Sequence, residues 1–150
     1  MFYEFLTDWS FDAPLRDVWD AIYHSEHWPE WWQGVESVVE IAKGRDDGIG
    51  NQRRYSWRGV IPYRLVFDIR TTRVETAALL EGVATGDLEG TGIWRFGTDG
   101  ERTAVHYEWR VRTTKSWMNL LSPLAGPLFR WNHDRVMASG EAGLAKTLRG

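Results

Sequence analysis

Apolar and polar residues alternate with a period of two over most of the chain, which is the pattern of β-strands with one buried face. Residues 2–11 are rich in aromatic side chains and stop at Asp12-Ala13-Pro14, so a first strand is expected there. Turn signals then recur at intervals typical of an antiparallel meander. The alternation predicts six further strands, at residues 35–41, 51–57, 63–70, 79–85, 90–96 and 103–113.

Three other segments are expected to be helical. Apolar residues recur three and four positions apart between Leu15 and Ile22, which predicts a short helix ending near residue 24. A second short helix is expected over residues 27–32, begun by Pro29. Residues 120–148 show no strand pattern, and a long final helix is expected there.

This order of elements predicts a single α+β domain spanning residues 1–150, because two domains would each have too small a core to offset the chain entropy. Hydrophobic residues make up 43% and charged residues 26%, the balance of a globular protein. The net charge is -3, and an acidic protein would be repelled by a polyanion, so no nucleic-acid partner is expected. No segment approaches the roughly 18 apolar residues of a membrane span, and we expect a cytoplasmic location without membrane insertion.

The residues with reactive or metal-binding side chains exclude several functions. There is no cysteine, hence no disulfide, thiolate nucleophile or Cys-based zinc site. His24 and His27 are three residues apart, a spacing that can bind metal, but the sequence around them offers no evident third ligand. Neither a metal nor a cofactor is expected. His133 and Asp134 are neighbours on the final helix and point about 100° apart, which argues against an acid/base dyad.

Three stretches carry a family resemblance. They are residues 84–94 (ATGDLEGTGIW), residues 131–137 (WNHDRVM), and the early pair Ala13-Pro14 and Val18-Trp19 followed by residues 28–31 (WPEW). Together they resemble the polyketide cyclase/dehydrase branch of the START-like (SRPBCC) superfamily, over residues 2–148. The resemblance implies a helix-grip fold, in which a curved seven-stranded antiparallel sheet wraps around a long C-terminal helix, with two short helices between the first two strands. It also implies a cavity between sheet and helix, but no particular reaction.

Glycines are candidates for making room in such a cavity. Four fall in adjoining predicted strands and two on the final helix: Gly82, Gly86, Gly90, Gly92, Gly140 and Gly143. Glycine in a strand also marks bulges and close approach of two backbones, and the sequence leaves both interpretations open.

One phase of the predicted strands carries large aromatic side chains and the other carries charges. We expect the aromatic phase to line the cavity, although some of its members could equally be plain core: Trp57, Tyr63, Phe67, Trp94, Tyr107 and Trp109. The charged phase is then expected on the outer face: Arg64, Asp68, Arg70, His106, Glu108 and Arg110. A slip of one residue would exchange the two sets.

On the final helix, Asn132, Arg135 and Ser139 fall at i, i+3 and i+7 and share one face. We expect this face to border the cavity together with Leu128, Trp131 and Val136. Arg135 would then hold a carboxylate, enolate or phenolate of a ligand while Asn132 orients it. In the alternative, Arg135 pairs with a carboxylate of the sheet or reaches solvent.

Three functions fit these observations. The first is binding of a hydrophobic or aromatic small molecule of polyketide-, lipid- or quinone-like chemistry, by a monomer or a homodimer. The second is a cyclase or dehydratase that uses the same cavity, with Arg135 and Tyr107 or Tyr63 as catalytic candidates. The third is a protein-interaction module, which would need an exposed apolar patch that the charged outer phase of the strands argues against.

Overall fold

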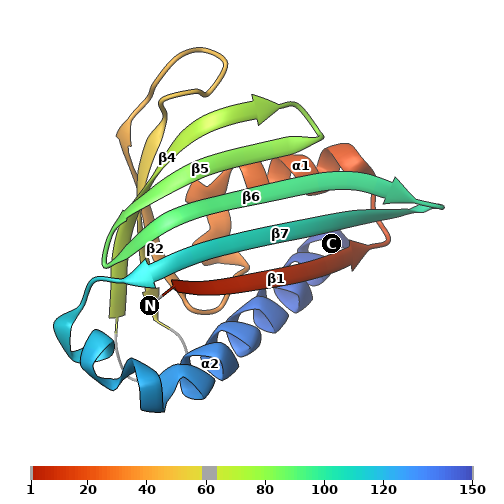
Figure 1. The fold of residues 1–150 in the computed structure, drawn as a ribbon. Helices are drawn as coiled ribbons and strands as arrows, with labels where there is room; N and C mark the ends of the chain where they lie inside the picture. The colour runs from red at the N-terminus through yellow and green to blue at the C-terminus, as the bar shows by residue number, and fades with distance from the viewer. Residues whose placement is uncertain (1, 59–63, 150) are drawn as a thin grey trace.

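The computed structural model describes residues 2–58 and 64–149, apart from the side chains of residues 117–119 and 121–125. The expected order of elements is found in it (Figure 1). The elements are β1 (Phe2–Phe11), α1 (Leu15–Tyr23), the 3-10 helix η1 (Ser25–Glu30), β2 (Val35–Ala42), β3 (Gln52–Arg58), β4 (Arg64–Glu75), β5 (Leu79–Gly86), β6 (Leu88–Asp99), β7 (Arg102–Thr113) and α2 (Ser116–Arg149).

The strands form one antiparallel sheet in the order β1-β7-β6-β5-β4-β3-β2. Each strand after β2 pairs with its sequence neighbour, and the chain closes the sheet by pairing β1 with β7. Figure 1 shows the long strands bent around a concave side, along which α2 runs beneath β1 and β7. The predicted α+β helix-grip fold is therefore confirmed, including its seven strands.

The two short elements between β1 and β2 differ in detail from their predictions. The first helix, α1, starts at Leu15 and ends at Tyr23, one residue before the predicted end; the Pro14 carbonyl accepts its first backbone bonds, at 3.0 Å from the Asp17 nitrogen. The second helix begins at Ser25, with Pro29 inside it. It is a 3-10 helix whose bonds span three residues, and a run this short suits that tighter winding.

Two strands are longer than predicted because their neighbours continue to pair with them. β4 runs on to Glu75, which pairs with Leu79 of β5 after a bulge near Thr71. β6 extends at both ends, since Leu88 pairs with Thr113 and Asp99 pairs with Arg102. The predicted strands leave residues 97–102 unpaired, but the hairpin keeps its pairing up to the turn between Asp99 and Arg102.

Close packing explains the glycines better than open space does. An added Cβ would lie 2.6 Å from Ile69 at Gly82, and 2.8 Å from the Trp109 ring at Gly92. On α2, an added Cβ at Gly140 would lie 2.5 Å from the Trp32 ring, whose indole N–H donates to the Val136 carbonyl at 2.9 Å. These glycines let backbones and rings approach each other, as the second interpretation of the sequence proposed.

α2 begins at Ser116, four residues before the predicted start, and contains Pro123 and Pro127. Its buried stripe is formed by Phe129, Met137 and Leu144, which succeed each other at spacings of eight and seven residues. That spacing keeps them on one side of a helix with 3.6 residues per turn. The stripe therefore determines which face of α2 looks toward the sheet.

Candidate functional site

A cavity of about 130 Å³ lies between the concave face of the sheet and α2. Its walls come from β1, η1, β3, β4, β6, β7 and α2, and most of them are aromatic rings. No Lys, Arg, Asp or Glu is among the lining residues that the structure describes. For scale, an apolar cavity of roughly 150 Å³ in another protein holds benzene, whereas drug-sized ligands occupy roughly 300–1,000 Å³. We call this space the main cavity; in the conformation described it has room for about one ring.

The strand residues predicted to line the cavity are brought together there. Trp57, Phe67, Trp94, Tyr107 and Trp109 all face the main cavity from four different strands. The charged phase lies on the other face of the sheet, as the alternation along each strand requires. Tyr63, the remaining wall and catalytic candidate, lies outside the residues that the structure describes.

The helix residues divide into two groups. Asn132 and Val136 line the main cavity. The structure corrects the expectation for the other four: Leu128 and Trp131 are 48% and 51% exposed, Arg135 is exposed, and Ser139 is half-buried outside the cavity lining.

The reason is the helical phase of α2. The inward side is centred on the apolar stripe through Phe129 and Met137, with Gly140 packed against Trp32. Arg135 is two residues before Met137, so its side chain points about 200° around the helix from that stripe. The stripe of polar residues chosen from the sequence overlaps the inward side only at Asn132.

His133 is a cavity residue that the sequence prediction missed. Its ring stacks on Phe5 with centroids 3.8 Å apart, and both ring nitrogens are buried without a hydrogen-bond partner. Asp134 lies 3.9 Å from Nδ1, beyond hydrogen-bond distance. Burial lowers the pKa of His133 from 6.5 to about 4, because the charged imidazolium would be desolvated there. The i, i+4 relation of His133 to Phe129 was the available signal in the sequence.

The tryptophan N–H groups around the cavity are not all alike. Trp28 donates to the Ala21 carbonyl at 3.3 Å, and Trp32 donates to the Val136 carbonyl. The Trp57 N–H, in contrast, is buried without a partner. A buried donor without an acceptor costs about 1–3 kcal/mol, so Trp57 and His133 are sites where a ligand could add a favourable contact if side chains shift to admit it.

Tyr107 sits between Trp94 and Trp109 on the sheet side. Its ring stacks on Trp94 at 3.8 Å between centroids, and lies 5.9 Å from Trp109. Burial raises the pKa of the Tyr107 hydroxyl far above its usual value of 10. At neutral pH this hydroxyl is therefore a hydrogen-bond donor and not a base.

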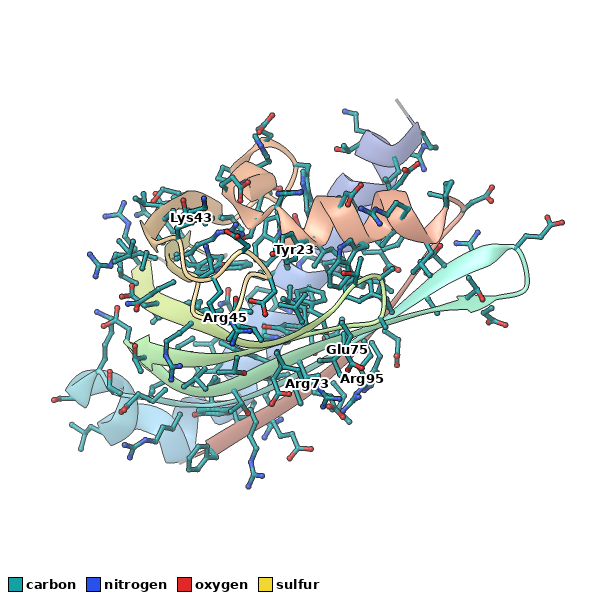
Figure 2. All side chains as sticks on the ribbon, turned by 90° about the horizontal axis from the view of Figure 1, so that it is seen from above. Tyr23, Lys43, Arg45, Arg73, Glu75 and Arg95 are labelled. Carbon is teal, nitrogen blue, oxygen red and sulfur yellow. The ribbon has the colours of Figure 1, made fainter. Side chains whose placement is uncertain are left out.

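A second, smaller cavity of about 50 Å³ adjoins the first. The two share five lining residues, which form the wall between them: Trp28, Tyr55, Ile69, Trp94 and Tyr107. We call these five residues the partition. The second cavity also contacts Tyr23, which Figure 2 shows beside the loop that carries Lys43 and Arg45. An added Cβ at Gly48 of this loop would overlap the Tyr23 hydroxyl, so the loop packs closely on that side chain.

Among residues 2–58 and 64–149, no three His, Asp or Glu side chains gather as a metal site requires. No helix in the described part of the chain is long and apolar enough to cross a membrane.

The chain matches a known protein family and is similar in fold to several solved structures. The profile of the family described as polyketide cyclase / dehydrase and lipid transport matches residues 11–139. No curated protein sequence matches the chain. Among solved structures, the chain is similar to the Zhui aromatase/cyclase from Streptomyces sp. R1128, with a TM-score of 0.80 and 14% identity, over 99% of this chain and 94% of that one.

It is also similar to a START superfamily protein from Mycobacterium smegmatis, with a TM-score of 0.76 and 13% identity over 97% of both chains. A third similar structure is that of the ginseng major latex-like protein 151 from Panax ginseng, with a TM-score of 0.72 and 8% identity over 98% of this chain and 97% of that one. At such identities the likeness shows a common fold, and the predicted START-like fold is confirmed.

Proposed function

Because this chain belongs to the polyketide cyclase / dehydrase and lipid transport family, we propose that its main cavity binds an apolar, ring-containing small molecule of polyketide-, lipid- or quinone-like chemistry. The observation that carries the proposal is the aromatic lining of the cavity, which has no charged side chain among its described members. The whole chain, residues 1–150, then acts as one ligand-binding domain.

Rigid aromatic walls suit this role for a physical reason. A ring that leaves water gains roughly 25 cal/mol for each Å² of apolar surface removed from it. Trp94 and Trp109 have few rotamers to lose, so little entropy opposes the contact. A molecule larger than one ring would extend from the main cavity or displace a wall side chain.

Catalysis of the cyclase or dehydratase type has weaker support. General acid/base work at neutral pH is most efficient with a pKa near 7. The pKa of His133 is lowered to about 4, and that of Tyr107 is raised far above its usual value. Arg135, a catalytic candidate from the sequence, is exposed on the far side of α2, and Tyr63, another candidate, lies outside the residues that the structure describes. Binding without catalysis is the better-supported function, and Tyr107 could serve a cyclase only as a hydrogen-bond donor.

The interaction module has the least support. Among the described side chains, the large apolar residues that are exposed are divided among four elements: Phe2 and Leu6 on β1, Val39 and Ile41 on β2, Val66 on β4, and Leu120, Leu128 and Trp131 on α2. The outer face of β7 carries charges, among them Arg110 and Arg112. A protein interface of useful size needs a continuous apolar patch of several hundred Å².

The test is a titration with α-methylstyrene, an uncharged single-ring compound. Binding is measured by calorimetry and by the NMR signals of the indole N–H groups of the ten tryptophans. We expect saturable binding at one site, with shifts concentrated at Trp57, Trp94 and Trp109. Native mass spectrometry of the protein purified from its host would then identify the resident molecule. A chain that gives no saturable shift with α-methylstyrene would overturn the proposal.

A further inference from the structure

Two residues of the partition, Tyr55 and Tyr107, turn their rings toward the main cavity and their hydroxyls toward the second one. Tyr55 shows this most directly: its ring stacks on Phe67, a main-cavity residue, at 5.8 Å between centroids. Its hydroxyl is 2.7 Å from the Ser25 hydroxyl, and Ser25 lines only the second cavity. Tyr55 therefore presents its ring to the main cavity and its oxygen to the second one.

Tyr107 has the same orientation. An added Cβ at Gly92 would lie 3.1 Å from the Tyr107 hydroxyl oxygen, and Gly92 lines the second cavity but not the main one. Among the hydrogen bonds of the described residues, none involves this hydroxyl. The Tyr107 oxygen is therefore a donor without a protein acceptor, at the boundary of the two cavities.

Charge at this boundary is balanced. Arg53 lines the second cavity and donates to the Ser25 hydroxyl at 2.8 Å and to the Tyr23 carbonyl at 2.9 Å. Its guanidinium also pairs with Glu26 at 3.2 Å. The second cavity thus offers hydrogen-bond donors, among them the buried Arg53 Nε–H, which has no partner. Because the guanidinium charge is already paired with Glu26 and the carboxylate of Glu81 also lines this cavity, a neutral acceptor is favoured over a carboxylate.

We propose that the second cavity is a binding site for an uncharged oxygen function of the ligand, such as an aryl ketone or quinone carbonyl, which accepts a hydrogen bond from Tyr107 while the ring occupies the main cavity. This inference rests on the proposed function, because it assigns one end of the same ligand. It names a chemical class: a ring with a neutral carbonyl one or two bonds away. An aromatic carboxylate would meet a guanidinium that is already paired with Glu26, and would be repelled by the carboxylate of Glu81.

The test compares acetophenone with α-methylstyrene, which has the same shape but a methylene group in place of the carbonyl oxygen. Both dissociation constants are measured for the wild type and for Tyr107→Phe, which removes only the hydroxyl. A net hydrogen bond of about 0.5–1.5 kcal/mol predicts that the ratio of the acetophenone Kd to the α-methylstyrene Kd rises roughly twofold to twelvefold in Tyr107→Phe.

Tyr3→Phe is the matched control. Tyr3 also lines the main cavity but packs edge-on against Phe129 of α2, on the side away from the partition. The ratio should stay at its wild-type value in this variant. As a direct signature, the C=O stretching frequency of bound acetophenone should be lower in the wild type than in Tyr107→Phe.

The outcomes separate the two proposals. If both compounds bind and the ratio is the same in all three proteins, the Tyr107 subsite is wrong and the proposed function stands. If α-methylstyrene does not bind the wild type, the proposed function fails, and the subsite fails with it. An equal carbonyl frequency in wild type and Tyr107→Phe would also overturn the subsite, independently of affinity.

Discussion

Trp94 and Tyr107 face each other across β6 and β7, with ring centroids 3.8 Å apart and 14° between the ring planes. This stacked pair belongs to both cavities, so its position determines how the apolar and the polar space are divided. Directly opposite residues on neighbouring antiparallel strands lie close enough for such contacts. The pairing of β6 with β7 places Trp94 directly opposite Tyr107. Any residue that fixes the Trp94–Tyr107 pair should therefore affect both stability and binding.

Gly92 is such a residue. In Gly92→Ala the added methyl group would lie 2.8 Å from the Trp109 ring and 3.1 Å from the Tyr107 hydroxyl, so both rings must shift. We expect a loss of about 1–3 kcal/mol in the free energy of unfolding and weaker binding of α-methylstyrene. Denaturant unfolding and calorimetry measure the two effects.

Gly97→Ala on the same strand is the control, because no atom lies within 4 Å of the position of its added Cβ. This variant should keep wild-type affinity and at least wild-type stability. Equal behaviour of the two variants would show that the crowding at Gly92 has no consequence.

Filling the main cavity should abolish binding without disturbing the rest of the fold. Val136 lines the cavity from α2, and Val136→Phe places a ring in the space of about 130 Å³. Since the cavity has room for about one ring, the affinity for α-methylstyrene should fall at least roughly tenfold, equivalent to about 1.4 kcal/mol. Leu128→Phe adds a ring to the exposed side of the same helix and should leave the affinity unchanged. Undiminished binding in Val136→Phe would place the ligand elsewhere.

The cavity walls contributed by strands could be predicted from the sequence. A strand has a side-chain period of two, so Phe67, Trp94 and Trp109 each had only two candidate orientations, and the charges of the other phase decided between them. The helix gave no such binary choice. Its inward face depends on contacts with residues far away in sequence, such as the packing of Trp32 on Gly140.

The chemistry of the site was harder to predict for a related reason. His133 is followed in sequence by an exposed acidic residue, Asp134. Only the fold reveals that the His133 ring is stacked on Phe5 of β1. The second cavity depends on the hydroxyl directions of Tyr55 and Tyr107, which alternation along a strand does not specify. Local patterns thus predicted the walls, whereas the polar contacts needed long-range geometry.

Arg135 provides a test of the corrected helix phase. Its side chain is exposed and lies about 200° around α2 from the buried stripe, so it does not contribute to the cavity lining. Arg135→Ala should bind both α-methylstyrene and benzoate as the wild type does, within about twofold, since exposed substitutions change free energies by roughly 0.5 kcal/mol or less. A selective loss of benzoate binding would restore Arg135 as an anion-binding residue.

His133 should make stability depend on pH. Its pKa is lowered to about 4 in the folded chain, against an ordinary value of 6.5 when the chain unfolds. As the pH falls from about 6.5 to about 4, the unfolded chain takes up a proton that the folded chain does not, and the free energy of unfolding decreases. The loss amounts to at most about 3.5 kcal/mol, from roughly 1.4 kcal/mol per pH unit, and this group adds nothing further below pH 4.

His133→Phe keeps a ring that can stack on Phe5 but removes the titrating group. We expect this variant to lose less stability than the wild type between pH 6.5 and 4, and to be more stable than the wild type at pH 4, because two buried nitrogens without partners are also removed. Urea unfolding at a series of pH values measures the difference. Parallel pH profiles for the two proteins would mean that His133 is protonated in the folded chain as readily as in the unfolded one, and that water reaches its ring.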